Sequence, residues 1–126
     1  MNSKRKGSAG ERELAKLLRT YGYDARRSVQ YNGFQGEADV VGVPGLHIEC
    51  KRCEQVRDEV FLQQAERDAK KNEIPVVMYR RSREKWKATV RLEVFMLIWN
   101  ELTDLQKHNI KEKIKFIGKV DKIGKQ

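Results

Sequence analysis

The pattern of apolar and polar positions along the chain predicts a short series of helices and strands. Leucines at helical spacing predict a first helix from residue 8 to about residue 21, and Gly22 supplies a stop signal after it. The unbroken apolar run at 74–81 (IPVVMYRR) is typical of a central strand covered on both faces. The other expected strands are 23–30, 38–43, 46–51 and 87–92, and the other expected helices are 57–72, 93–101 and 103–115.

The order of these elements predicts the fold class. Residues 38–43 and 46–51 are expected to form a hairpin across Pro44 and Gly45, and residues 31–37, with two glycines, a loop before it. The expected order is one helix, three strands, a helix, two strands and further helices. This order indicates an α/β protein with one mixed central sheet flanked by helices. A chain of 126 residues is long enough for a hydrophobic core and is most simply a single domain, 1–126.

Three charged side chains interrupt the apolar runs of the hairpin: Asp39, Glu49 and Lys51. Because side chains alternate between the faces of a strand, His47, Glu49 and Lys51 share one face, and the turn brings Asp39 alongside. Two carboxylates beside an ammonium form a site that suits Mg²⁺ and metal-assisted hydrolysis of a phosphate. A buried Glu–Lys or Asp–Lys ion pair fits the same spacing, so the spacing alone leaves both interpretations open.

Glu11 is a further candidate because it lies on the inward stripe of the first helix, close to Leu14 and Leu18 around the helix axis. An inward acid near the start of this helix can complete a metal site. Ser8 and Glu11 also match the S-x-x-E capping box, in which the glutamate hydrogen-bonds back to the helix start. From the residues alone, capping is the favoured role for Glu11.

The charge of the chain favours a polyanionic partner. There are 27 Lys and Arg against 18 Asp and Glu, which gives a formal net charge of +9 and leaves DNA, RNA and anionic membranes open. The densest basic group is expected to add general affinity for a phosphate backbone, and it contains Arg80, Arg81 and Arg83. Arg27 and Ser28, at the end of the first strand, suit phosphate contact or form a solvated basic edge.

The remaining sequence features narrow the classes of protein further. No apolar run approaches the roughly 18 residues that span a bilayer, so we expect no membrane association and a cytoplasmic location. Cys50 and Cys53 form a CxxC without a second pair of ligands, which favours a core residue and a loop residue over a zinc or redox site.

Several of these segments, taken in order, resemble a known family. GSAGERELAKLLRTYGYDARRS, a glycine-containing loop, ADVVG and HIECK are similar to the archaeal-type Holliday junction resolvases and their phage and prophage relatives, which belong to the PD-(D/E)xK nuclease superfamily. QAERDA and PVVMYRR are also similar to the phage-type members. The resemblance covers about residues 4–92, leaves a helical C-terminal extension of about 93–126, and implies a restriction-endonuclease-like fold. Ala38 stands where the motif has proline.

The resemblance implies a role for individual residues. Glu11, Asp39 and Glu49 correspond to the metal-binding acids, and Lys51 to the lysine that orients the nucleophile, so all four are the candidate catalytic residues. The resemblance thus favours a metal-site role for Glu11 over capping. Candidate DNA contacts are Arg27, Ser28 and Gln64, with Gln63 leaving the last register open by one, together with Arg80, Arg81 and Arg83.

The activity implied is that of a Mg²⁺-dependent endonuclease, with Mn²⁺ as a substitute ion, that resolves four-way DNA junctions by paired symmetric nicks. Cleavage would leave a 5′-phosphate and a 3′-hydroxyl, and a two-fold homodimer would pair two sites on one branched substrate. Two alternatives remain at this point: a PD-(D/E)xK nuclease that acts on other DNA structures, and a non-catalytic nucleic-acid-binding module whose acids form structural ion pairs.

Overall fold

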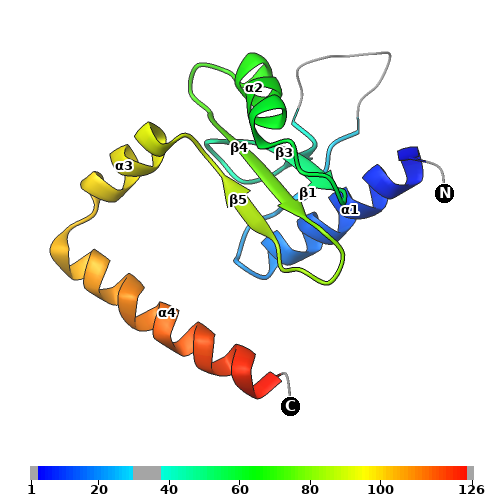
Figure 1. Cartoon of the computed structure of the whole chain (residues 1–126). Helices are drawn as coiled ribbons and strands as arrows, with labels where there is room; N and C mark the ends of the chain where they lie inside the picture. Colours follow the sequence, from blue (N-terminus) through cyan, green and yellow to red (C-terminus); the bar gives the residue numbers. More distant parts are fainter. Residues whose placement is uncertain (1–2, 30–37, 125–126) are drawn as a thin grey trace. The chain divides into compact units, whose positions relative to one another are not determined.

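The computed structural model describes residues 3–29 and 38–124 and divides the chain into two compact units, Met1–Val90 and Arg91–Gln126. The first unit holds a sheet with a helix packed on each face (Figure 1). Its helices are α1 (Ser3–Arg19) and α2 (Asp58–Asp68). Its strands are β1 (Arg26–Arg27), β2 (Val40–Val41), β3 (Leu46–Arg52), β4 (Ile74–Arg80) and β5 (Lys87–Thr89).

The five strands follow the order β1-β2-β3-β4-β5 in one mixed sheet. β3 and β4 are parallel, joined by the crossover helix α2, and the other neighbours are antiparallel. The predicted hairpin is present as β2 and β3, with Val40 paired to Ile48 across the turn. The prediction of an α/β fold with a mixed central sheet between helices is therefore confirmed.

Several predicted boundaries are wrong, and one of them changes an interpretation. Helix α1 begins at Ser3 rather than at residue 8, so Ser8 lies inside the helix and cannot act as the N-cap of a capping box. The strand expected at 23–30 is only the two residues of β1, and that expected at 87–92 ends at Thr89. The loop expected at 31–37 lies outside the described residues.

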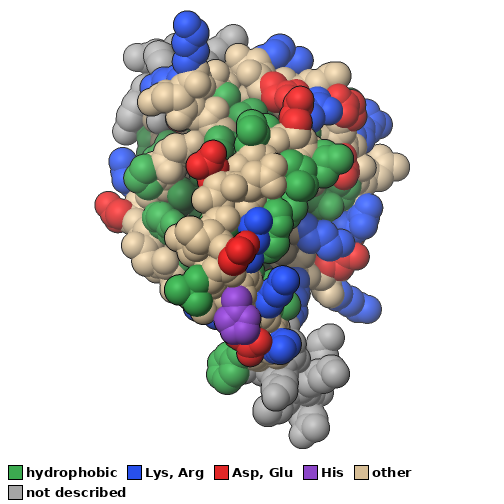
Figure 2. Space-filling view, turned by 90° about the vertical axis from the view of Figure 1, so that its left-hand side faces the viewer, with side chains coloured by type: hydrophobic (Ala, Val, Ile, Leu, Met, Phe, Trp, Pro, Cys, Tyr) green, Lys and Arg blue, Asp and Glu red, His purple; other side chains and the backbone are tan. Residues whose placement is uncertain are grey.

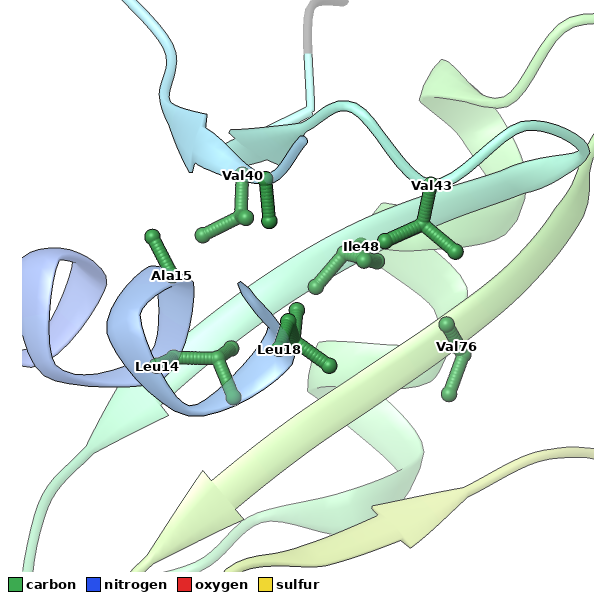
Figure 3. Close-up of a cluster of buried hydrophobic side chains, with 8 residues drawn as sticks. Leu14, Ala15, Leu18, Val40, Val43, Ile48 and Val76 are labelled. Carbon is green, nitrogen blue, oxygen red and sulfur yellow. The ribbon is translucent and has the colours of Figure 1, made fainter. Parts of the chain in front are cut away.

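The larger hydrophobic cluster fills the space between α1 and the sheet (Figure 3). Leu14 and Leu18 point from α1 toward Val40 of β2 and Ile48 of β3, and Val76 of β4 closes the cluster. Each fully buried side chain of this size contributes about 1.5–3 kcal/mol of burial free energy. This packing fixes α1, and with it Glu11, against the strands that carry Asp39 and Glu49.

The opposite face of the sheet is covered by α2. Leu62 and Ala65 pack there against Val77, the neighbour of Val76 in β4. Because Val76 and Val77 enter different clusters, β4 is a central strand with both faces covered, as its apolar run predicted. The face of β3 that carries His47, Glu49 and Lys51 is the face that α2 covers.

Gly10 permits α1 to approach β3 closely. A Cβ built at Gly10 would lie 2.6 Å from the Cβ of Arg52, a distance that real Cβ atoms do not adopt. We expect Gly10→Ala to force α1 away from β3 and to lower the melting temperature by about 4 to 15 °C, measured by circular dichroism. Gly7→Ala is the matched control, because nothing lies within 4 Å of that Cβ and alanine favours a helix by about 1 kcal/mol. Equal melting temperatures for the two variants would contradict the close approach.

The second unit contains α3 (Leu92–Glu101) and α4 (Asp104–Gly124), the latter longer than the predicted 103–115. Helix α3 has no buried residue, and its apolar side chains include Leu92 and Leu97, which are 75% and 68% exposed. Hydrophobic side chains interspersed with Lys and Arg reach the surface in the view of Figure 2. Among the described residues, no helix combines the length and apolarity that crossing a bilayer requires.

Candidate active site

Two carboxylates meet where β2 and β3 pair. Asp39 precedes β2, and its backbone N–H donates to the carbonyl of Ile48, 2.9 Å away. Since Val40 and Ile48 point into the core under α1, Asp39 and Glu49 project from the other face of the hairpin. The Cys50 N–H donates to Asp39 Oδ2 over 2.8 Å, which orients the Asp39 carboxylate toward β3. The predicted juxtaposition of these two acids is present in the structure.

The pKa of Glu49 reflects this environment. The side chain is 2% exposed, and burial, followed by the charge of Asp39 and a hydrogen bond with it, raises its pKa to about 8. The charge of Lys51 acts in the opposite direction and lowers it. The Lys51 charge therefore does not offset the burial of Glu49 and the charge of Asp39, and the arrangement differs from a balanced ion pair.

Lys51 lies beside helix α2. Its Nζ is 4.9 Å from the centroid of the Phe61 ring, a cation–π contact that holds the amine over the same face of β3 as Glu49. Along α2, Gln64 and Asp68 follow Phe61 at helical spacing and are half-buried, whereas Gln63 is exposed and donates to Glu59 over 3.1 Å. The inward register of α2 therefore belongs to Gln64 rather than to Gln63.

Glu11 is held by Arg27. The guanidinium Nε donates to Glu11 Oε2 over 2.8 Å, and this link joins α1 to β1. Burial, partly offset by the hydrogen bond from Arg27, raises the pKa of Glu11, and the charge of Asp39 raises it further. Glu11 therefore lies close enough to Asp39 for their charges to interact. One of its oxygens is engaged by Arg27 in this structure.

Among the described residues, the set of three potential metal ligands whose atoms lie within 4.8 Å of one another is His47, Glu49 and Asp68. It shares only Glu49 with the set that the sequence suggested. The alternation of β3 already placed His47 on the face of Glu49. No sequence signal identifies Asp68, because its approach depends on how α2 crosses β3.

The three other arginines predicted to contact DNA differ in their exposure and in their hydrogen bonds within the fold. Arg80 donates through Nε to Glu13 Oε1 over 2.7 Å, and its side chain is 21% exposed. Arg81 donates to the Glu54 carbonyl, whereas Arg83 is exposed in the β4–β5 turn with a φ of 66°. Arg80 is thus held by a hydrogen bond within the fold, and Arg83 is the most accessible of the three.

Glu13 makes structural contacts that the sequence did not indicate. It accepts hydrogen bonds from Arg80 and, over 3.0 Å, from Trp86 Nε1, which joins α1 to the end of β4 and the turn before β5. Partial burial acts to raise the pKa of Glu13, but these two hydrogen bonds together lower it. Trp86 packs against the core beside α1, so its side chain closes the turn before β5.

Ser28 is buried at the end of β1. It is 7% exposed, its backbone N–H donates to the Asp39 carbonyl over 2.9 Å, and its hydroxyl oxygen has no partner among the described residues.

Of the two cysteines, Cys50 packs against the core, and burial strongly raises its thiol pKa. Both cysteines are free thiols, and the expectation that Cys50 is a core residue is confirmed.

The comparison with known families adds to this geometry. Residues 2–123 match the family described as "Phage putative PDDEXK endonuclease". The chain belongs to this family. It is accordingly a PD-(D/E)xK nuclease, and the expected resemblance to the phage-type members is confirmed. No curated protein sequence matches this endonuclease.

A solved structure supports the fold of the endonuclease. It is similar to the Holliday junction resolvase Hjc from the archaeal hyperthermophile Archaeoglobus fulgidus, with a TM-score of 0.53 and 21% sequence identity. The match covers 65% of this chain and 74% of the resolvase. It confirms the restriction-endonuclease-like arrangement of one mixed sheet between helices.

Proposed function

We propose that this nuclease is a Mg²⁺-dependent, structure-specific DNA endonuclease that resolves four-way junctions by paired symmetric nicks. The observation that carries the proposal is the half-buried Asp39 carboxylate beside the buried Glu49 carboxylate, with the Lys51 amine on the same strand face. The family membership supports cleavage of a nucleic acid. The likeness to a Holliday junction resolvase supports the choice of a branched substrate.

The residues present suit a hard divalent cation. Asp39 and Glu49 offer oxygen ligands, and Glu11, whose charge interacts with that of Asp39, is the candidate for a third if it leaves Arg27. The raised pKa of Glu49 expresses the cost of burying its charge and of placing it beside Asp39, a cost that a cation offsets. When bound, Mg²⁺ supplies positive charge that polarises the scissile phosphate and favours ionisation of the attacking water, and Mn²⁺ can substitute.

The side chains of the chain supply positioning and charge. The Lys51 amine, held over Phe61, orients the attacking water and stabilises negative charge that develops at the phosphate. Water attacks phosphorus in line and the 3′ oxygen leaves, which yields a 5′-phosphate and a 3′-hydroxyl. Arg27, released from Glu11, is available to contact a phosphate oxygen in a bidentate manner.

The wider contacts with DNA follow from charge and location. Ser28 lies beside Asp39, Gln64 faces β3 from α2, and Arg83 is exposed on the turn after β4. Arg80 and Arg81 add positive potential around that turn. Such contacts to the backbone recognise the shape of a branched DNA rather than its sequence.

The proposed reaction also implies an oligomeric state for the active protein. A four-way junction must be cut at two symmetric positions, and the first unit of one chain carries one Asp39–Glu49 pair. A two-fold homodimer brings two such sites to one substrate, so we propose that the active form is a dimer.

The test compares two substrates of the same sequence, a labelled four-way junction and a linear duplex, with and without Mg²⁺. We expect Mg²⁺-dependent nicks at symmetric positions in opposing strands of the junction, and at least about tenfold slower cleavage of the duplex. Sequencing gels locate the nicks, and ligation of the products verifies the 5′-phosphate and 3′-hydroxyl. Equal rates on the two substrates would indicate a nuclease of another specificity.

A further inference from the structure

A second group of potential ligands lies on the α2-covered face of β3. One ligand atom each from His47, Glu49 and Asp68 lies within 4.8 Å of the other two. His47 and Glu49 are 1% and 2% exposed, and Asp68, in the last turn of α2, is half-buried. The group shares Glu49 with the Asp39–Glu49 pair and contains neither Asp39 nor Glu11.

The charges around this group are unbalanced. No hydrogen bond or salt bridge joins the Asp68 side chain to another described residue. Glu73 adds a third carboxylate, with Oε1 at 3.7 Å from His47 Nδ1. Three carboxylates thus surround one imidazole, and a bound cation would offset this excess of negative charge.

The orientation of His47 suits a metal ligand. Its Nε2 is 3.3 Å from Glu49 Oε1, on the side of the group, while Nδ1 faces Glu73 on the other side. With the proton on Nδ1, the Nε2 lone pair faces the ligand group, where a cation would replace the 3.3 Å contact between Nε2 and Glu49 Oε1. Histidines that bind metals often have a carboxylate beside their second ring nitrogen, and Glu73 lies on that side of His47, 3.7 Å away and beyond hydrogen-bond distance.

We propose that His47, Glu49 and Asp68 form a second cation site, which takes a transition ion such as Zn²⁺ in preference to Mg²⁺. An imidazole nitrogen suits Zn²⁺, whereas Mg²⁺ prefers oxygen ligands and water. Glu49 has one oxygen beside His47 and hydrogen-bonds to Asp39, so it bridges the two sites. The site goes beyond the proposed reaction and does not depend on its substrate.

The first test is Zn²⁺ titration of the full chain by calorimetry in excess Mg²⁺, which occupies the oxygen site. We expect one Zn²⁺ per wild-type chain, and at least about tenfold weaker binding for Asp68→Asn. Asp58→Asn is the matched control, because Asp58 is an exposed aspartate on the same helix. Equal Zn²⁺ affinities for the two variants would overturn the proposal.

A measurement on the wild-type chain removes any dependence on the folding of variants. The chain contains two histidines, His47 and His108, so the ring signals can be followed separately by NMR. We expect stoichiometric Zn²⁺ to shift the ring signals of His47 and to leave those of His108 in place. An unshifted His47 ring at saturating Zn²⁺ would overturn the site.

The outcomes for Asp39→Asn separate this inference from the proposed function. We expect this variant to retain Zn²⁺ binding, because Asp39 is not among the three ligands. Loss of Zn²⁺ binding in Asp39→Asn would assign the ion to the oxygen site and reject the second one. Retained DNA cleavage by the same variant would reject the proposed function and leave the Zn²⁺ site untouched.

Discussion

Replacing Asp39 with asparagine is expected to lower the rate of junction cleavage at least about 1000-fold, while affinity for the junction stays within about twofold. The isosteric amide retains an oxygen to accept the hydrogen bond from Cys50 N–H, so the hairpin is preserved. What is lost is one of two anionic oxygen ligands, and the charge of a metal ion contributes several kcal/mol to transition-state stabilisation. Single-turnover cleavage of a labelled junction in Mg²⁺ measures the rate, and a gel-shift titration in Ca²⁺ measures affinity.

The control for this variant is Asp24→Asn, because the Asp24 side chain is 97% exposed. It is expected to cleave at the wild-type rate. The pH dependence of the free energy of unfolding tests whether Asp39→Asn folds like the wild-type chain. Since the folded-state pKa of Glu49 is about 8 against about 4.3 unfolded, stability without metal falls as the pH rises through this window. Asp39→Asn removes a like charge and should reduce that fall. Cleavage by Asp39→Asn at the wild-type rate would refute the site.

Replacing Lys51 with alanine is expected to lower turnover by about 100- to 10,000-fold, with junction affinity nearly unchanged. The amine is held by the Phe61 ring on the face of Glu49, where it can act on the attacking water. Single-turnover rates over a range of Mg²⁺ concentrations and a binding titration separate the two effects. Lys16→Ala, which removes an exposed lysine from α1, is the matched control.

The Mg²⁺ series distinguishes catalysis from electrostatic support of the ligands. The Lys51 charge lowers the pKa of Glu49, so its removal also weakens ionisation of that ligand. If Lys51 acts on the water, saturating Mg²⁺ leaves the turnover defect in place. Full recovery at high Mg²⁺, or a loss of binding without a loss of turnover, would show that Lys51 has another role.

The local parts of the fold and site could be predicted from the sequence because they depend on alternation within one strand and one tight turn. Strand periodicity placed Glu49 and Lys51 on one face, and the Pro44–Gly45 turn brought Asp39 beside them. The apolar run of β4 indicated a strand covered on both faces. These features require no knowledge of how distant segments pack.

The features that were missed depend on contacts between distant segments. Asp68 reaches His47 only because α2 crosses back over β3, and Glu13 meets Trp86 across 73 positions of sequence. The capping box failed for a different reason, since α1 continues N-terminally to Ser3 and places Ser8 inside the helix. A local motif predicts a helix start only when the preceding residues are not themselves helical.

The roles of the individual site residues depend on where a divalent ion binds. The most direct measurement is a crystal structure of the chain grown with Mn²⁺, with the ion located from its anomalous scattering. We expect a peak within about 2.5 Å of carboxylate oxygens from both Asp39 and Glu49. A fully occupied Mn²⁺ elsewhere in the crystal, with no peak between these two carboxylates, would contradict it.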